Sequence, residues 1–508
     1  MGYTLSLTDI ALASAGVWLV YRFLKKPALP YPPGPPGLPL LGNALDIPKT
    51  AMQQYKQFSE WNDKYGNIIH LSALGLHIVV LNDQQAARDL LDKRSANYSD
   101  RPTMAMAGEL CGWDRPLVMH HYDDTFKEFR RYFFKLFGTR QSLEAFYPLF
   151  ESEGHVLMRR ILAAPGEFPT HLRKCAGSII LKVTYGYDVN ATGSDPVVDV
   201  VDEGVRQMDD LLSSGWLVDL IPWMKNIPAS FPGATFQKIA QHYRKTLDTM
   251  ADLPYGMVKE KIASGRAEPC FVTQQLGESD ITPEKEDVIK WAATSIYGGG
   301  ADTTVSAVHT FFLAMTLYPD VQAKAQAEID AVIGRDRLPT LADRPDLPYL
   351  TALINEVLRW SPVAPLAIPH ATMQDDVYQG YLIPKGSLVI PNVWFMANNP
   401  EIYKNPRIFN PDRFIDTPGH PAEPDPHNVV FGFGRRICPG INLADATAWL
   451  EIALALATLS ISKAVDESGN EITPEYKYTE ENVSHPVSFP CSIKARDARA
   501  EALVAATE

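Results

Sequence analysis

The ten residues FGFGRRICPG, Phe431 to Gly440, place one cysteine between glycines and next to a basic pair. A cysteine binds a metal as a thiolate, and that negative charge needs donors close by. Gly434 and Gly440 allow the backbone to curl so that N–H groups approach the sulfur of Cys438. Arg436 offers a permanent cation, and Phe431 an apolar cover that limits water. One cysteine beside a glycine-rich turn is usually a structural cysteine, but the complete pattern favours a metal–thiolate site.

The same residues match the haem-binding signature of the cytochrome P450 family, F-x-x-G-x-R-x-C-x-G, at every fixed position. The chain resembles this family over essentially its whole length. The stretches APLAIPH (364–370) and DDVYQGYLIPKG (375–386) resemble mushroom-type microsomal members, which include enzymes of secondary metabolism and of broad aromatic oxidation. The resemblance implies a mainly α fold with a minor β-sheet region. It also implies a haem b with Cys438 as its axial iron ligand, and monooxygenase activity with O2.

Composition narrows the possible partners and the compartment. The formal net charge is −13, from 47 basic and 60 acidic residues, so the chain is a poor candidate for binding nucleic acid. Its five cysteines are odd in number, far apart and without a CxxC pair. This pattern argues against a disulfide framework and a structural zinc site, and it favours a reducing compartment.

The first 26 residues are expected to form a transmembrane anchor. Residues 4–24 are mostly apolar and just long enough to cross a bilayer, which takes about 20 residues. Lys25 and Lys26 follow and place the rest of the chain in the cytosol. A cleaved signal peptide would carry positive charge at its start and a small-residue cleavage site, and a buried core helix is the plainer alternative. We expect a single-pass protein of the endoplasmic reticulum membrane, in contact with lipid, whose Asn97, Asn190 and Asn482 sequons stay unmodified.

Two further regions follow the predicted anchor. Residues 27–43 hold seven prolines in PALPYPPGPPGLPLLGN and should form a stiff extended hinge. Residues 44–508 should form one catalytic domain. Within it, residues 66–82 predict a β-hairpin that turns near Gly75, and residues 377–390 again predict strands. The rest after residue 84 is expected to be mainly helical, with the sheet region near the N-terminal end.

Residues 291–315 predict a long apolar helix with an unusual centre. The run Gly298 to Gly300 costs about 1 kcal/mol per glycine relative to alanine, which indicates that something lies close to the backbone. Asp302 and Thr303 follow, and an acid and a hydroxyl in an apolar helix suggest a proton relay and a local distortion. A bent helix with a satisfied aspartate is the alternative. By resemblance, Asp302 and Thr303 deliver protons to bound dioxygen.

Three charged residues are expected to brace the haem-binding loop. Glu356 and Arg359 in NEVLRW share one helix face, which alone indicates only a surface pair. Arg413 lies in FNPDRF. The resemblance implies that these residues form a buried network, in which the loss of one partner would cost on the order of 3–5 kcal/mol.

The resemblance also assigns cations to the haem propionates, namely Arg436, His370 and Arg130. Family members usually carry Trp at the position of Phe126, so one propionate donor is missing here. The charge run around Arg130 is either a solvated helix face or a docking patch for an acidic NADPH–cytochrome P450 reductase. That patch would consist of Lys127, Arg130, Arg131, Lys135 and Arg140. No flavin or nicotinamide motif is visible, so the reductase would be a separate protein.

The resemblance places a substrate pocket on the haem face opposite Cys438. Its lining is expected to draw on the 98–119 loop and the stretch 483–487, and to include Met104, Trp113, Ile296, Tyr297, Ala301, Val363 and Leu366. Each of these side chains could equally be core. The pocket should suit a lipophilic aromatic, terpenoid or indole-type molecule. Two rival functions keep the haem: an isomerase or dehydratase that needs no reductase, and a haem-binding sensor or carrier without turnover.

Replacing Cys438 by alanine should remove the spectral signature of thiolate ligation. With the sulfur gone, the reduced haem protein treated with carbon monoxide should lose the absorption band that cysteine-ligated haem gives. The measurement is a carbon monoxide difference spectrum, with Cys491→Ala as the matched control. A Cys438→Ala protein that kept the band would refute the assignment.

Overall fold

Helices form most of the described chain. The structure, a computed structural model, describes residues 28–190, 193–213, 215–279 and 281–507. The longer helices are α2 (Ala51–Tyr65), α5 (Asp124–Phe137), α7 (Tyr147–Ala163), α8 (Phe168–Tyr185), α9 (Pro196–Ser213), α11 (Thr235–Ala263), α13 (Pro283–Gly300), α14 (Thr303–Leu317), α15 (Pro319–Val332), α16 (Pro348–Trp360) and α19 (Ile441–Thr458).

Shorter helices connect these elements. The short α-helices are α3 (Gln84–Ala87), α4 (Ser95–Tyr98), α6 (Arg140–Leu143), α10 (Leu217–Leu220), α12 (Phe271–Leu276), α17 (Val393–Asn398), α18 (His427–Val430) and α20 (Ala498–Ala505). Single turns of π- or 3₁₀-helix are η1 (Arg88–Lys93), η2 (Ala105–Leu110), η3 (Glu144–Phe146), η4 (Pro165–Glu167), η5 (Pro222–Asn226), η6 (Leu341–Asp346), η7 (Pro411–Phe414) and η8 (Gly434–Arg436).

The described strands form three small sheets. The first has the order β1-β2-β6-β3, in which only β2 and β6 run parallel; its strands are β1 (Ile68–Ala73), β2 (Leu76–Leu81), β6 (Leu388–Pro391) and β3 (His370–Ala371). The second pairs β4 (Asp376–Tyr378) with β5 (Tyr381–Ile383). The third has the order β8-β7-β9, made of β8 (Glu471–Ile472), β7 (Leu459–Val465) and β9 (Cys491–Ala495).

The predicted hairpin is present. Strands β1 and β2 pair antiparallel, and the two residues between them, Leu74 and Gly75, both have positive φ (49° and 88°). Two consecutive residues with positive φ match the twist of a tight hairpin, and glycine accepts this conformation without strain. The third sheet was not expected. Its strands β7 and β9 lie 26 residues apart in the sequence. Because they stabilise each other by pairing, the sequence pattern of either strand alone does not predict the sheet.

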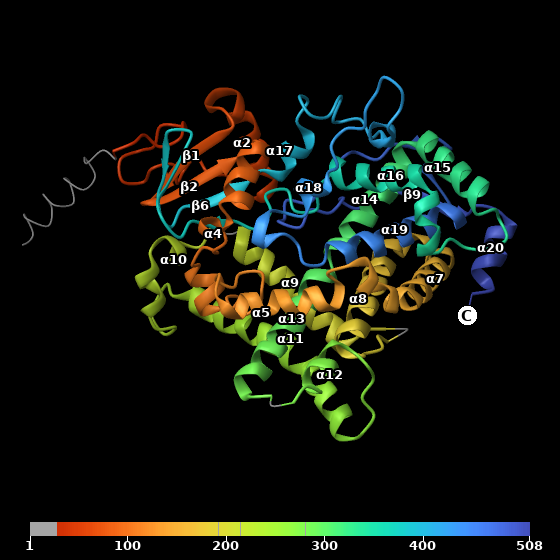
Figure 1. Ribbon diagram of the computed structural model, residues 1–508, viewed down its shortest axis with the longest axis horizontal. Helices are drawn as coiled ribbons and strands as arrows, with labels where there is room; N and C mark the ends of the chain where they lie inside the picture. The colour runs from red at the N-terminus through yellow and green to blue at the C-terminus, as the bar shows by residue number, and fades with distance from the viewer. Residues whose placement is uncertain (1–27, 191–192, 214, 280, 508) are drawn as a thin grey trace, which may run out of the picture.

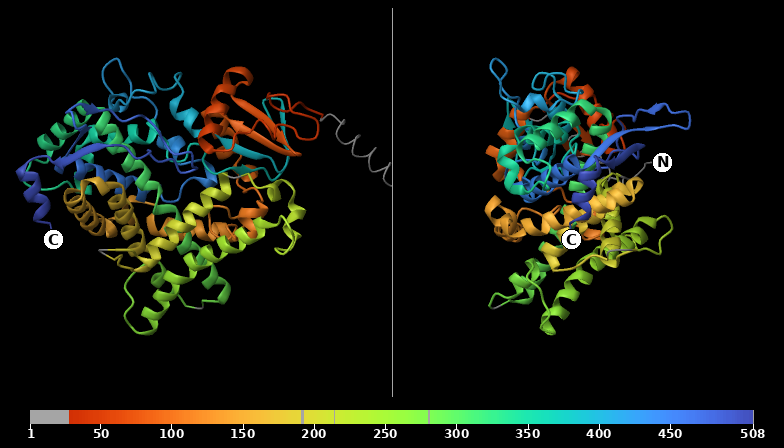
Figure 2. Two further views of the ribbon diagram at one scale, coloured as in Figure 1. Left: turned by 180° about the vertical axis from the view of Figure 1, so that it is seen from behind. Right: turned by 90° about the vertical axis from the view of Figure 1, so that its right-hand side faces the viewer.

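The first sheet lies at one end of the molecule. Figure 1 shows β1, β2 and β6 with α2 at that end, α7 and α20 at the opposite end, and α5, α9, α11 and α13 between them. The view from behind in Figure 2 shows the same division. Helix α8 packs against α7, α13 and α14, and α14 also packs against α19. The largest hydrophobic core lies among these helices.

The described part of the proline-rich segment is extended only up to residue 37, and it lies against the sheets. Residues 38–43, which were also expected to be extended, form a tight turn closed by the bridge between Leu38 and Gly42, with positive φ at Leu40 and Gly42. The carbonyl of Pro33 accepts a hydrogen bond from the backbone N–H of His70 at 2.9 Å, and that of Pro30 accepts from Leu382 at 2.8 Å. A Cβ on Gly34 would lie 1.9 Å from the carbonyl oxygen of His70. These contacts join the segment to β1 and β5. The predicted anchor, residues 1–26, lies outside the described residues.

The predicted helix over 291–315 is broken in the middle. Helix α13 ends at Gly300 and α14 begins at Thr303, so Ala301 and Asp302 form a turn. The glycine run allows close packing, as expected, at two of its three positions. A Cβ on Gly300 would lie 2.5 Å from Cδ1 of Ile180, and one on Gly298 would lie 3.0 Å from Cε of Met250. A Cβ on Gly299 would meet nothing within 4 Å.

Helix α19 is the one described helix with the length and composition to span a membrane. It begins three residues after Cys438, and 72% of its apolar window is buried inside the protein. Trp449 and Leu450 on this helix are almost completely inaccessible to solvent. A helix so enclosed by other helices is a core element, because its apolar surface is already buried.

Replacing Gly300 by alanine should destabilise the protein. The new methyl group would force Ile180 away from the α8–α13 contact, and overpacking of this kind costs about 1–3 kcal/mol. The matched control is Gly177→Ala on α8, where a Cβ meets nothing within 4 Å. That substitution should be neutral or stabilise by up to about 1 kcal/mol. Thermal unfolding of both variants tests the contact, and equal melting temperatures would contradict it.

Candidate active site

Cys438 lies in a tight loop between η8 and the start of α19. Its backbone N–H donates to the carbonyl of Phe431 at 2.8 Å, which closes the loop on itself. Burial raises the pKa of the Cys438 thiol, and the backbone N–H of Gly440 and the charge of Arg130 partly oppose this shift. Without a metal the thiol therefore stays protonated, and a bound metal cation would reverse this.

The two glycines of the loop have different environments. Gly434 has φ = 54°, and a Cβ there would lie 2.0 Å from the carbonyl oxygen of Leu91. Its N–H also donates to the Asp92 carboxylate, so Gly434 packs the loop against η1. Gly440 has an ordinary φ of −90°, and a Cβ there would lie 3.9 Å from the sulfur of Cys438. The close approach of the loop to η1 therefore requires glycine at position 434. Gly440 instead contributes its backbone N–H to the sulfur of Cys438.

A cavity of about 1100 Å³ lies between this loop and the break in the α13–α14 helix pair. Of the residues predicted to bind the cofactor, Gly434 does not line this cavity. The others do; they are Arg130, His370, Phe431, Arg436, Cys438 and Gly440. Asp302, Thr303 and the unobstructed Gly299 line the same cavity. The loop and the helix break, which are far apart in the sequence, therefore share one internal space.

Three guanidinium groups border the cavity without an anionic partner. Arg436 donates to the carbonyls of Ser99 and His120, each at 2.7 Å, and Arg130 donates to that of Ile437 at 2.6 Å. Arg101, which no sequence motif had indicated, donates to the carbonyls of residues 118, 368 and 369. Burial lowers the pKa of all three arginines. None of them forms an ion pair with a described residue, so the cavity has a positive rim.

His370 is fully buried beside this rim. Its Nδ1 lies 2.7 Å from the carbonyl oxygen of Tyr98 and donates to it, because a carbonyl oxygen can only accept. The other ring nitrogen, Nε2, therefore remains available to a group in the cavity. Burial, with the nearby charges of Arg101 and Arg436, lowers the pKa of His370 to about 3. The imidazole is therefore neutral at pH 7 unless an anion enters the cavity. The prediction that His370 serves as a cation for the haem propionates therefore holds only when the propionate itself is bound in the cavity.

Phe126, at the position where relatives were expected to carry Trp, supports Arg436. Its ring lies 3.9 Å from the guanidinium carbon of Arg436, a cation–π contact. Phe126 is buried and also lines the cavity. The ring thus supplies packing to the rim but no hydrogen-bond donor.

Asp302 is held by two charged or polar side chains from distant elements. Nη1 of Arg173 on α8 lies 2.5 Å from Oδ1, and Nε2 of His485 lies 3.0 Å from Oδ2. Burial raises the pKa of Asp302, but His485 and Arg173 outweigh it, and the net shift is downward. The hydroxyl of Thr303 donates to the carbonyl of Gly299 at 2.9 Å. The sequence motif indicates Asp302 and Thr303, but no motif indicates Arg173 or the contact with His485.

The structure brings Glu356, Arg359 and Arg413 together in the interior. Arg359 donates to both carboxylate oxygens of Glu356, at 2.7 and 2.9 Å, and Nε of Arg413 lies 3.0 Å from Oε2. The side chains of Glu356 and Arg359 are 0% exposed and that of Arg413 is 3% exposed. Arg413 extends the network to Glu423 at 2.6 Å, a partner that the sequence motifs had not indicated.

Three of the seven predicted pocket residues do not line the cavity. Trp113, Ile296, Ala301 and Val363 do line it. Leu366 instead packs in the core beneath the first sheet, because the chain turns between 364 and 367 and directs its side chain outward from the cavity. Tyr297 and Met104 pack against the main helical core.

The predicted basic patch is exposed with one exception. Lys127, Arg131, Lys135 and Arg140 on α5 and α6 are solvent-exposed. Arg130 is half-buried and points its guanidinium at the Cys438 loop. Arg435 of the loop is also exposed, and it donates to the hydroxyl of Tyr122 at 2.5 Å.

Comparison with known proteins shows the family to which this chain belongs. A cytochrome P450 family model matches residues 32–476. Cytochrome P450 monooxygenase 208 of Postia placenta is 49% identical over 97% of this chain and 96% of its own length. Monooxygenase claR of Ampulloclitocybe clavipes is 42% identical, over 98% and 92%. The structure of a zebra fish cytochrome P450 with abiraterone superimposes with a TM-score of 0.69 at 23% identity, over 87% of this chain and all of that one, which shows the shared fold.

The chain belongs to the cytochrome P450 family and is a fungal-type monooxygenase with a cysteine-ligated haem. The cavity fits that cofactor. Haem b carries two carboxylates, and the rim offers three guanidinium groups that lack an anionic partner among the described residues. Cys438 supplies a soft sulfur ligand from the same wall.

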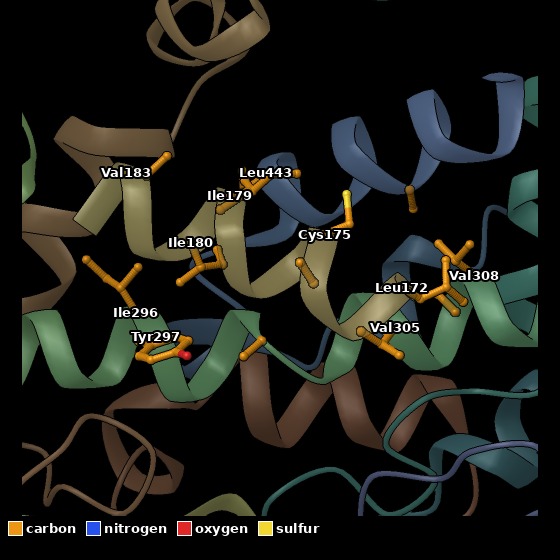
Figure 3. Close-up of a cluster of buried hydrophobic side chains, with 14 of the residues drawn as sticks. Leu172, Cys175, Ile179, Ile180, Val183, Ile296, Tyr297, Val305, Val308 and Leu443 are labelled. Atoms are coloured by element: carbon orange, nitrogen blue, oxygen red, sulfur yellow. The ribbon is translucent and has the colours of Figure 1, made fainter. Parts of the chain in front are cut away.

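A buried carboxyl group, Glu451, lines the cavity from α19. The sulfur of Cys175 lies 3.7 Å from its Oε1. Figure 3 shows Cys175 on α8 with its sulfur directed toward α19. Burial raises the pKa of Glu451 to about 8, so the folded protein holds this group protonated at neutral pH.

Replacing Glu451 by glutamine should flatten the dependence of stability on pH. Between its ordinary pKa of 4.5 and the folded value of about 8, the unfolded chain releases this proton and the folded chain keeps it. The contribution of Glu451 to stability therefore falls as pH rises through this window. Melting temperatures of the holoprotein from pH 5 to 9 test this, with exposed Glu475→Gln as the control. Parallel curves for wild type and Glu451→Gln would contradict it.

Proposed function

We propose that this chain inserts one oxygen atom from O2 into a lipophilic small molecule, with Cys438 as the haem-iron ligand and electrons from NADPH through a separate reductase. One observation carries the proposal. Cys438, the cationic rim and the Asp302–Thr303 break border one cavity of about 1100 Å³. This chemistry requires a thiolate ligand, cations that hold a dianionic cofactor, and a pair of residues that transfers protons. Cys438, the arginines of the rim, and Asp302 with Thr303 would fill these three roles.

The residues of the rim would hold the cofactor. Arg101, Arg130 and Arg436 would bind its carboxylates, and His370 would become protonated as those anions approach. The N–H of Gly440 and the charge of Arg130 would stabilise the Cys438 thiolate. When bound, the haem supplies oxygen activation, which a thiolate ligand favours by donating electron density.

Asp302 and Thr303 would control proton supply on the opposite wall. The side chain of Arg173 is 44% exposed and that of Asp302 only 13%, so the pair reaches from solvent to the cavity. The carboxylate of Asp302 can take a proton from outside and, by rotating away from His485, present it to the cavity. The hydroxyl of Thr303 can donate either to the Gly299 carbonyl or to a group in the cavity, because it rotates freely about its C–O bond.

A lipophilic substrate fits the apolar walls of the cavity. Aliphatic and aromatic side chains from helices and loops along much of the chain line it, among them Trp113, Ile180, Ile296, Leu358, Val363 and Ile368. Pockets of this kind bind apolar ligands and orient them with few polar groups. Aromatic, terpenoid and indole-type molecules are the proposed substrates, in secondary metabolism or xenobiotic oxidation.

The exposed basic patch of α5 and α6 supports docking of an acidic reductase. Lys127, Arg131, Lys135 and Arg140, with Arg435 from the Cys438 loop, concentrate positive charge in a chain of net charge −13. Arg130 reaches from the same helix to the carbonyl next to Cys438. Such complementarity steers association and sets orientation.

Membrane attachment is part of the proposal, with the catalytic domain in the cytosol. Exposed apolar side chains follow the predicted anchor and recur near α10; they are Leu38, Leu40, Leu41, Leu45, Leu217, Trp223 and Phe231. Figures 1 and 2 show α10 and the segment after residue 27 at the same end of the long axis. Exposed apolar side chains in segments at one end of the molecule are suited to a lipid interface.

Turnover should depend on a reductase. The haem protein incubated with NADPH, a fungal cytochrome P450 reductase and a panel of indoles, terpenes and polycyclic aromatics should give hydroxylated or epoxidised product with label from ¹⁸O2. Omitting the reductase should abolish product. Product formed without reductase, or without label from O2, would support an isomerase or dehydratase and refute the monooxygenase proposal.

Replacing Thr303 by alanine should lower the product formed per NADPH consumed. Loss of the hydroxyl removes a proton donor beside the cavity, so electrons are lost to peroxide or water. The matched control is Thr316→Ala on the same helix, which removes an equivalent bond to the Phe312 carbonyl away from the cavity. The measurement is the ratio of product and peroxide to NADPH. Equal ratios in Thr303→Ala and wild type would remove Thr303 from the proton path.

A further inference from the structure

The ring of Phe431, which opens the Cys438 loop, stacks on the imidazole of His427. The two ring centroids lie 5.2 Å apart with an interplanar angle of 24°. His427 begins α18, and Phe431 follows one turn later, so the contact joins side chains on one face of that turn. The carbonyl of Phe431 also accepts the N–H of Cys438. His427 therefore touches the residue that closes the loop around the sulfur.

Two carboxylates hold the imidazole from both sides. Nδ1 lies 2.8 Å from Oδ1 of Asp425, and Nε2 lies 3.3 Å from Oδ1 of Asp445 on α19. Burial lowers the pKa of His427, but the hydrogen bonds and charges of Asp425 and Asp445 outweigh it and raise the pKa to about 9. The imidazolium form therefore prevails at neutral pH.

The position of Asp445 is set in turn by Arg344. The guanidinium donates to both oxygens of the carboxylate, at 2.6 and 3.0 Å. The side chains of Arg344, Asp445 and His427 are 16%, 12% and 18% exposed, so solvent screens these charges only partly. With His427 protonated, the four groups sum to zero charge, and loss of that proton would leave the cluster at −1.

The cluster also continues the buried network of α16. Arg413 pairs with both Glu356 and Glu423, and Asp425 follows Glu423 by two residues. The chain from α16 to the Cys438 loop is thus held by charge at 413, 423, 425 and 427 in succession. Phe431 is the point where this series reaches the loop.

We propose that His427 is a positioning residue of the haem–thiolate centre, which fixes the ring of Phe431 over the Cys438 loop and places a positive charge beside it. The inference rests on the proposed ligation of iron by Cys438. A cation near the thiolate favours the reduced iron, because reduction adds negative charge to the centre. Removing the cation should make reduction harder and shift the midpoint potential to a more negative value.

The plainer alternative is that His427 merely clamps α18 to α19. In that case its replacement would lower thermal stability and leave the potential unchanged. Separating charge from packing needs three variants. His427→Gln removes both ring and charge, His427→Phe keeps a ring against Phe431 without charge, and His427→Lys keeps a charge without the ring. Exposed His420→Gln, in the loop before α18, is the matched control.

The experiment is spectroelectrochemical titration of the substrate-free holoprotein. His427→Gln and His427→Phe should both shift the midpoint potential in the negative direction, beyond the difference between wild type and His420→Gln. His427→Lys should recover part of the shift. If His427→Gln yields no folded holoprotein, His427→Phe carries the test, since its ring preserves the packing.

Two results would overturn the inference: potentials of His427→Gln and His427→Phe equal to wild type, or a negative shift in His427→Lys as large as in His427→Phe. A carbon monoxide difference spectrum on each sample keeps the two proposals apart. Loss of the thiolate-type band in the wild type would refute Cys438 ligation itself. A normal band with an unchanged variant potential would refute only the role of His427.

Discussion

A fully buried carboxylate, that of Glu356, organises the region around the Cys438 loop. Arg359 and Arg413 neutralise it, and their remaining N–H groups donate to backbone carbonyls at 397, 404, 406 and 408. A charge in this position is tolerated only while every partner is in place, and loss of one partner strands the others in a medium of low dielectric. The irregular segment from 397 to 425 therefore has a defined path although it contains little regular structure. That path leads directly into α18 and the loop.

The cavity results from two local irregularities that only the surrounding packing makes stable. On one side, Gly434 adopts a positive φ and lets the loop touch η1. On the other, Gly298 and Gly300 let α11 and α8 approach the end of α13, and the helix breaks at Ala301 and Asp302. Because Gly299 faces the space between, the two irregularities leave room for a flat cofactor. The reactive parts of the site lie where regular structure is interrupted.

Charge is distributed differently over the two walls. The loop side carries arginines without anionic partners, which suits an anionic cofactor, whereas Asp302 on the opposite wall is already paired with Arg173 and His485. The loop side carries the P450 signature from Phe431 to Gly440, and the rest of the cavity has an apolar lining that includes Trp113, Ile180 and Val363. Family membership therefore establishes the monooxygenase class, and the proposal of a lipophilic substrate rests on this lining.

The sequence alone determined the ligand loop, the hairpin within residues 66–82 and a distortion of the helix near residue 300, because each depends on neighbours within a few residues. That the distortion is a complete break between Gly300 and Thr303 was decided by the packing of α8 and α11. Cys438, Gly434 and Asp302 were recognisable because of such local patterns, whereas the buried role of the Glu356–Arg359 pair followed only from the family resemblance. The tertiary structure decided the contacts of Arg101, Arg173, His427 and His485, the third sheet, and the exclusion of Leu366, Tyr297 and Met104 from the cavity. Arg173 and Asp302 are 129 residues apart, and no local periodicity encodes such a pairing. Those contacts form only when the helices pack, since burial and a partner from a distant segment together give each charge its role.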